Sequence, residues 1–248
     1  MGIFIKNDSQ VAIMRTAGQI CARTHELLTR HIRPGITTEE LSKIAEEYIR
    51  SQGAIPTFLG YRGFPGAICT SINSQVIHGI PSLTRLKNGD IISIDIGVCY
   101  KRFHGDAART HPVGVVTNEH QRLMDVARES FFEGARYARH GCHLHEISAA
   151  IDNFVTSHGF SVVQEWCGHG IGRQLHEDPQ IPHTRQDNRG PRLTKGMTIA
   201  VEPMINVGSH ELTMLDDTWT VVTRDGKYSA HYENTMLVTT GEPDILTI

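Results

Sequence analysis

The spacing of apolar residues predicts two helices at the start of the chain. Apolar side chains recur every three or four residues after Asp8-Ser9, which can cap a helix that stops at Arg33-Pro34-Gly35. Thr37-Thr38-Glu39-Glu40 matches a capping box, in which hydroxyl and carboxylate oxygens accept from the first free backbone N–H groups. The apolar positions from Leu41 to Ile49 then predict a second helix, which ends at Gly53.

Later segments predict strands, then helices, then strands again. An Asn88-Gly89 turn precedes an apolar strand over Ile91–Tyr100. The order of the elements indicates an α+β protein with two halves in tandem, because a doubly wound parallel sheet would alternate strand and helix one by one. The remaining expected elements are helices over 117–139 and 145–157, strands over 161–166 and 198–201, and a hairpin of 218–223 with 228–239 turned at Asp225-Gly226.

Composition narrows the class of protein. The chain has 248 residues, a formal net charge of −3 and no basic face suited to phosphate backbones, so we expect no nucleic-acid partner. No apolar run is long enough for a membrane span or the core of a signal peptide. The five cysteines are scattered and never spaced as Cys-x-x-Cys, which indicates reduced thiols. These features together predict a cytoplasmic protein.

Two aspartates interrupt a stretch that otherwise reads as buried sheet. Asp95 lies in a strand whose other face carries isoleucine and valine, and Asp106 follows across an expected turn. Their spacing can place both carboxylates on one sheet face. Such buried charges need a cation beside them. That cation is either one of the nearby bases Lys101, Arg102 and Arg109 or a metal ion, and this segment alone favours neither.

The second half of the chain adds similar residues. Glu202 and Glu233 each follow or interrupt an apolar strand, and His169 lies between glycines that allow close backbone approach. Four carboxylates with one imidazole are too acidic a set for a structural zinc site. Carboxylates that bridge two divalent ions are typical of two-metal hydrolysis. The donors suit Mn, Fe(II), Co or Zn, so the identity of the metal stays open.

These motifs, in this order and spacing, resemble the type I methionine aminopeptidases of the bacterial short form. The resemblance runs from about Asp8 to the C-terminus. It implies a pita-bread α+β fold, in which 1–248 form a single metallopeptidase domain with pseudo-twofold halves of roughly 8–115 and 116–248, and antiparallel sheet surrounds a dimetal site. The motifs that carry it are Asn73–Pro81, Ile94–Gly97, His104–Thr110, Gly168–Gly172, Glu202–Met204 and Trp219–Val221.

The resemblance implies a role for each of the five metal-site candidates. Asp95 would chelate one ion, and Asp106 and Glu233 would bridge both ions. His169 and Glu202 would complete the shell of the other ion. The expected cofactor is therefore two divalent ions per chain, from among Co, Mn, Fe(II) and Zn.

The resemblance also implies catalytic and substrate-binding residues. His78 would contact the scissile amide nitrogen, and His176 would hydrogen-bond the carbonyl oxygen as it gains negative charge. Glu202 would move a proton from the attacking water toward the leaving nitrogen. A narrow apolar pocket for methionine would consist of Tyr61, Phe64, Cys69 and Trp219, with Leu175 nearby as ordinary core.

Three positions depart from the common pattern of the family. Ala200 stands where a hydroxyl residue is frequent, Asn234 follows Glu233 where histidine is more usual, and Leu175 replaces a frequent aromatic residue. All five metal-site candidates are present. The departures therefore bear on rate and pocket shape rather than on the presence of activity.

The function implied is removal of the initiator methionine from nascent polypeptides whose second residue is small. The ribosome is a candidate place of encounter, and we expect a monomer. An X-Pro aminopeptidase or prolidase of the same fold could share all five ligands, although such enzymes usually carry a separate N-terminal domain, for which 248 residues leave no room. Further alternatives are a non-catalytic pita-bread protein that binds peptides and an acidic cluster without metal.

Overall fold

A computed structural model describes residues 2–248, which form four α-helices, a short 3-10 helix and fifteen strands. Met1, the first residue of the expected single domain, lies outside the described residues. The α+β class is confirmed. The helices are α1 (Asp8–Thr29), α2 (Thr38–Ser51), α3 (Asn118–Ala135) and α4 (Leu144–Ser157). The strands are β1 (Ile55–Pro56), β2 (Cys69–Ile72), β3 (Gln75–Ile77), β4 (Ile91–Tyr100), β5 (Phe103–Pro112), β6 (Ser161–Val162), β7 (Gly168–Gly170), β8 (Glu177–Ile181), β9 (Thr198–Val201), β10 (Met204–Asn206), β11 (Leu212–Met214), β12 (Val221–Thr223), β13 (Ser229–His231), β14 (Asn234–Leu237) and β15 (Asp244–Ile245).

Both N-terminal helices begin with a capping box. In α2 the Thr37 hydroxyl accepts from the backbone N–H of Glu40, and the Glu40 carboxylate accepts from the backbone N–H of Thr37, as the sequence predicts. In α1 the cap is Asn7, one residue before the expected Asp8-Ser9 cap, and Gln10 completes the box. These contacts satisfy N–H groups that the helices leave free, so each helix has a defined start.

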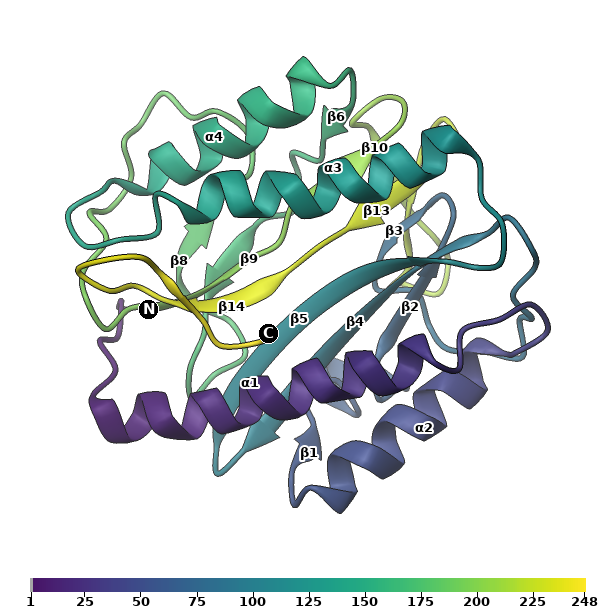
Figure 1. The fold of residues 1–248 in the computed structure, drawn as a ribbon, viewed down its shortest axis with the longest axis horizontal. Coiled ribbons are helices and arrows are strands. Elements are labelled where there is room, and N and C mark those ends of the chain that lie inside the picture. Colours follow the sequence, from purple (N-terminus) through teal and green to yellow (C-terminus); the bar gives the residue numbers. More distant parts are fainter. Residues whose placement is uncertain (1) are drawn as a thin grey trace.

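The first half of the chain is a sheet covered by α1 and α2. Strand β4 lies at its centre and pairs with β1, β2 and β5, all antiparallel. The β4 side chains that face the helices are fully buried, and they form one apolar core with the buried faces of α1 and α2. Figure 1 shows both helices running along the same side of the β4–β5 hairpin. Asp95 lies on the opposite face of this hairpin, the face that α1 and α2 do not cover.

The second half places α3 and α4 over a different set of strands. A five-stranded sheet in the order β15-β14-β9-β7-β8 and a three-stranded sheet in the order β13-β10-β6 lie beneath these helices. Figure 1 shows α3 and α4 on the side of the molecule opposite α1 and α2, with β5 and β14 between the two helix pairs. Each half therefore contributes a helix layer outside and strands inside.

Some expected elements differ from the structure. The strand expected over 161–166 ends at Val162, and the helix expected over 117–139 ends at Ala135. The expected hairpin of 218–223 with 228–239 is wrong, because β12 pairs with β11 and β3 while β13 pairs with β10. The Asp225-Gly226 turn does form, but the strands that leave it separate to join different sheets.

A seam of hydrogen bonds joins the two halves along β5. The backbone N–H of Glu233 donates to the carbonyl of Ala108 at 2.9 Å. On one side of this bond, the Thr235 hydroxyl accepts from the N–H and donates to the carbonyl of Asp106. On the other side, the Thr110 hydroxyl does the same for His231. Residues 231–235 thus run antiparallel to β5, with a threonine hydroxyl closing each end of the seam.

Two expectations from composition also have structural counterparts. All five cysteines are free, which fits reduced thiols. Along residues 2–248 no helix has the length and apolar character that crossing a bilayer would require.

Candidate metal centre and substrate pocket

The β4–β5 hairpin brings Asp95 and Asp106 together. In its register Asp95 lies opposite Ala108 and Asp106 lies opposite Gly97. The two aspartates are therefore diagonal neighbours on the same face, as their spacing predicts. The hairpin turns through Lys101 and Arg102, whose positive φ angles form a two-residue connection.

Three strands of the second half supply the other candidates. His169 lies in β7, Glu202 directly follows β9, and Glu233 directly precedes β14. Because β9 pairs with both β7 and β14, the ends of these strands meet. The glycines beside His169 make this approach possible: a Cβ at Gly168 would lie 2.4 Å from the carbonyl oxygen of Ala200, and one at Gly170 would lie 2.1 Å from that of Asp178.

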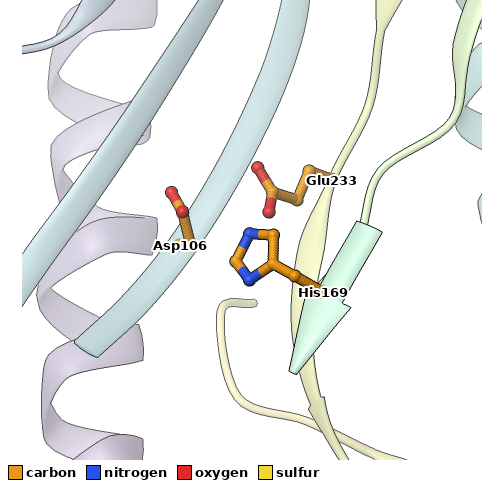
Figure 2. A group of neighbouring side chains, drawn as sticks. All are labelled: Asp106, His169 and Glu233. Atoms are coloured by element: carbon orange, nitrogen blue, oxygen red, sulfur yellow. The ribbon is translucent and has the colours of Figure 1, made fainter. Parts of the chain in front are cut away.

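Asp106, His169 and Glu233 form a buried cluster between the halves. One ligand atom from each residue lies within 4.8 Å of those of the other two. Figure 2 shows the three side chains gathered in one place from separate parts of the chain. Their residues are only 3%, 7% and 2% exposed, so solvent does little to stabilise the carboxylates. The arrangement has the size and donor types of a divalent-cation site.

The hypothesis that basic side chains neutralise these acids is wrong. Within residues 2–248, no lysine or arginine forms an ion pair with Asp95, Asp106, Glu202 or Glu233. The expected partners Lys101 and Arg102 are exposed at the hairpin turn. Arg109 donates instead to the backbone carbonyl of Glu233, to Asn234 Oδ1 at 2.5 Å and to the carbonyl of Thr247 at 3.2 Å.

Unsatisfied oxygen atoms test whether a metal fits. Asp95 Oδ1, Asp106 Oδ1 and Glu233 Oε1 are buried and have no hydrogen-bond partner. A buried carboxylate oxygen without a partner costs several kcal/mol in order of magnitude, a cost that a cation bound between them removes. Oxygen donors with one imidazole suit Mn, Fe(II), Co or Zn. The residues present therefore fit divalent ions.

Burial also shapes the protonation of the site. It raises the pKa of Asp95 to about 7 and that of Glu202 to about 8. The pKa values of Asp106 and Glu233 are raised well above their usual values, first by burial and then by the neighbouring carboxylates. Burial lowers the pKa of His169 to about 3, which leaves a neutral imidazole able to act as a ligand.

Glu202 is surrounded by three imidazoles, two of which the sequence reasoning missed. Its Oε1 lies 3.6 Å from His169 Nε2, and its Oε2 lies 3.6 Å from His231 Nε2. Its backbone N–H donates to His183 Nε2 at 3.1 Å. His231 could have been found, because it precedes Glu233 by two residues and so shares its side of an extended strand. His183 has no such signal in the sequence.

A cavity of about 610 Å3 opens onto this cluster. Its apolar end contains Phe64 and Trp219, whose rings meet edge to face with centroids 5.1 Å apart. Leu175 is buried in the same apolar cluster as Phe64 and also lines the cavity. The cavity brings together every site residue expected from the sequence: Tyr61, Phe64, Cys69, His78, Asp95, Asp106, His169, His176, Glu202, Trp219 and Glu233.

The two expected catalytic histidines lie at the wall of the cavity. His78 has a positive φ of 59° and packs edge-on against Trp166, and burial lowers its pKa to about 4. His176 Nδ1 lies 3.0 Å from the Tyr61 hydroxyl, and its ring centroid lies 4.4 Å from that of His169. Both imidazoles are thus held beside the acidic cluster without belonging to it.

The departures from the family pattern lie beside the candidate ligands. Asn234 Oδ1 accepts from Arg109 and from the Thr247 hydroxyl at 2.9 Å, so this side chain ties the C-terminus to the seam. Ala200 is fully buried opposite His169 and Thr235. Neither side chain replaces a candidate ligand.

Comparisons with known proteins agree with one another. The profile of metallopeptidase family M24 matches residues 12–240. A methionine aminopeptidase of Clostridium perfringens is 51% identical over 246 residues, which cover 99% of both chains. The crystal structure of methionine aminopeptidase from Rickettsia prowazekii superposes with a TM-score of 0.98 at 40% identity, covering 100% of both chains.

A more distant structure separates the main hypothesis from its closest alternative. The Xaa-Pro dipeptidase of Bacillus anthracis superposes with a TM-score of 0.79 at 25% identity. The match covers 98% of this chain but only 61% of the dipeptidase. Similarity over the full length of both chains is therefore found with the methionine aminopeptidases named above and is absent from this dipeptidase.

Proposed function

This chain belongs to metallopeptidase family M24, where it groups with the short bacterial type I methionine aminopeptidases, and we propose that it removes the initiator methionine from nascent polypeptides using two divalent ions. The observation that carries the proposal is the buried cluster of Asp106, His169 and Glu233 at the floor of a cavity with an apolar end.

The ligand set we propose draws on both halves. Asp95 would chelate one ion, His169 and Glu202 would hold the other, and Asp106 and Glu233 would bridge them. Two observations support this assignment: the unpartnered carboxylate oxygens, and the absence within residues 2–248 of any lysine or arginine ion pair to these acids. When bound, such ions supply Lewis acidity for a peptide carbonyl and a nucleophilic water near neutral pH.

The protein's own residues would do the rest of the chemistry. Glu202 would accept a proton from the attacking water and pass it to the leaving nitrogen. His78 would hold that nitrogen in position. His176, which the Tyr61 hydroxyl contacts at Nδ1, would hydrogen-bond the carbonyl oxygen as negative charge develops.

The apolar end of the cavity would select methionine. Methionine is long and flexible, and its sulfur makes favourable contacts with aromatic edges of the kind that Phe64 and Trp219 present. Tyr61 and Cys69 line the same space, and Leu175 completes it. Because one methylene in such a pocket is worth only about 1–3 kcal/mol, norleucine and leucine should be poorer substrates that are still cleaved.

We extend the proposal to the setting of the reaction. Residues 1–248 would work as a single domain, with halves of roughly 8–115 and 116–248 that close around the metal ions. The substrates would be the N-termini of nascent chains met in the cytoplasm, with the ribosome as a candidate site of encounter and the protein as a monomer.

The decisive experiment compares three tripeptides. The protein is dialysed against chelator, reloaded separately with Mn, Fe(II), Co or Zn, and given Met-Ala-Ser, Met-Lys-Ser or Ala-Pro-Ser. We expect release of methionine from Met-Ala-Ser alone and a limit of two ions per chain in a metal titration. The variant Glu119→Gln changes an exposed acid in the first turn of α3 and should bind and cleave as the natural chain does.

Two results would contradict this function. Cleavage of the proline peptide alone would establish an X-Pro aminopeptidase. A folded protein that cleaves none of the peptides with any metal would indicate a peptide-binding member of the fold.

A further inference from the structure

Strand pairing in the second half brings the His231 imidazole close to the Glu202 carboxylate. Strand β10 begins two residues after Glu202, and Met204 in it pairs with His231 in β13. The backbone N–H of Tyr232 also donates to the carbonyl of Pro203 at 3.2 Å. The chain just after Glu202 and the chain just before Glu233 therefore run side by side, which brings the His231 imidazole to the Glu202 carboxylate.

The backbone of His231 is fixed from the first half. Its N–H donates to the Thr110 hydroxyl at 2.9 Å, and that hydroxyl donates to the His231 carbonyl at 2.9 Å. Both polar groups of the residue are thereby satisfied by one side chain of β5. A backbone held at both groups restricts where the imidazole can lie.

The imidazole itself has an unused nitrogen. His231 is 1% exposed, and its Nε2 is buried without a hydrogen-bond partner. His231 Nε2 lies 3.6 Å from Glu202 Oε2, and the other oxygen of that carboxylate lies 3.6 Å from His169 Nε2. That distance exceeds a hydrogen bond, and a shift of about 0.7 Å would bring the two atoms to the usual N···O separation of about 2.9 Å. A buried N–H with no other partner gains free energy by that closure.

We propose that His231 is a positioning residue for Glu202: its Nε2–H holds Oε2 and thereby turns Oε1 toward His169. This inference rests on the proposed function, in which Glu202 binds an ion and carries the proton. Partners of this kind fix the rotamer of a ligand without contacting substrate. The sequence resemblance assigns no role to this residue.

Two substitutions of His231 test the proposal. His231→Leu removes the N–H, and His231→Gln keeps an amide N–H at a similar reach. We expect His231→Leu to lower kcat for Met-Ala-Ser by about 10–100-fold while KM changes less than about twofold and two ions stay bound. We expect His231→Gln to restore kcat to within about threefold. The visible absorption of the Co(II)-loaded protein should shift in the leucine variant and return in the glutamine variant.

His111 offers a matched control. It lies with His231 on a second cavity of about 260 Å3, and its Nε2 is likewise buried and unpartnered. Within residues 2–248 His111 forms no hydrogen bond or ion pair with Glu202, so His111→Leu should leave kcat and the Co(II) spectrum unchanged. If the unsubstituted protein cleaves Met-Ala-Ser with none of the metals, the proposed function itself is wrong. If the natural chain is active, an unchanged kcat in His231→Leu overturns the positioning role, and so does a loss of bound metal in both His231 variants.

Discussion

The two halves of the molecule deliver their acids to the centre in different ways. The first half uses one hairpin, in which β4 and β5 pair over ten residues each and carry both Asp95 and Asp106. The second half takes His169 from within β7, Glu202 from just after β9 and Glu233 from just before β14, and these strands are only three or four residues long.

Local contacts therefore position the residues of the first half, whereas contacts between distant segments position those of the second half. A hairpin closed by a two-residue turn fixes its own register, so its two aspartates need little help from the rest of the chain. Short strands far apart in sequence need contacts that close long loops. In this protein those contacts include the seam along β5, where Thr235 and Thr110 close the two ends. The position of Glu233 relative to Asp106 therefore depends on the hydrogen bonds of this seam.

The largest effect should come from Asp106 and Glu233, the two carboxylates proposed to bridge the metal ions. Asp106→Asn should lower kcat/KM for Met-Ala-Ser by more than the roughly 100-fold seen for supporting residues, with loss of bound metal. Asp95→Asn should cost less, since the proposed role of Asp95 touches one ion and that of Asp106 touches both. Glu233→Gln should resemble Asp106→Asn. Peptide hydrolysis and metal analysis check the order, and a larger loss in Asp95→Asn would contradict the bridge.

Breaking the seam should destabilise the fold as well as the site. Thr235→Val keeps the side-chain shape but leaves the N–H and carbonyl of Asp106 buried without partners, which should cost about 1–3 kcal/mol. Thr110→Val should cost a similar amount through His231. Urea unfolding measures both. Thr156→Val, an exposed helical control, should change stability by less than about 0.5 kcal/mol.

The pocket joins the halves through aromatic contact. Trp219→Leu should raise KM for Met-Ala-Ser by about 2–10-fold with a smaller change in kcat, because sulfur–aromatic contacts are worth roughly 0.3–1.5 kcal/mol. Phe64→Leu should act in the same direction. Since the two rings touch, the double variant should lose less than the sum of the single losses. Strictly additive losses would indicate that the rings act independently on substrate.

The raised pKa values of the buried carboxyl groups predict that the folding stability of the metal-free protein depends on pH. Burial raises the folded pKa of Asp95 to about 7 and that of Glu202 to about 8, above their unfolded values. The folded state then binds more protons than the unfolded state, so stability falls as pH rises toward 8. The buried histidines, whose pKa values are lowered, destabilise only below about pH 6.5.

Thermal unfolding of the metal-free protein should therefore move to lower temperature between pH 6.5 and 8.5. Divalent ions should remove this slope, because they favour the ionised carboxylates and release protons on binding. Calorimetric titration in buffers of different ionisation enthalpy measures those protons. Equal slopes with and without metal would contradict a cation at these carboxylates.

The smallest effect should come from the hairpin turn. Lys101 and Arg102 adopt positive φ, which suits asparagine and glycine better. The double substitution Lys101→Asn with Arg102→Gly should stabilise the protein by up to about 1 kcal/mol and leave kcat/KM within about twofold. A tenfold loss of activity would instead show that these bases support Asp95 and Asp106.

Local patterns in the sequence were enough to predict much of the fold. The Ile91–Tyr100 strand and the Thr37–Glu40 capping box are where the sequence places them, because propensity, turn chemistry and the apolar pattern agree there. The hairpin of 218–223 with 228–239 was wrongly predicted, because a turn sequence specifies a reversal of the chain and not which strands pair afterwards. β12 and β13 found other partners in sheets built by distant segments.

The sequence by itself determined which residues offer metal-binding atoms and that Asp95 and Asp106 share a sheet face, since strand periodicity and a two-residue turn are local properties. Only the tertiary structure excluded Lys101, Arg102 and Arg109 as ion-pair partners, because Arg109 turns to the backbone of the seam while the other two face solvent. It alone brought His183 and His231 to Glu202: His231 arrives through the pairing of β10 with β13, and His183 arrives from the segment after β8 to accept from the Glu202 N–H.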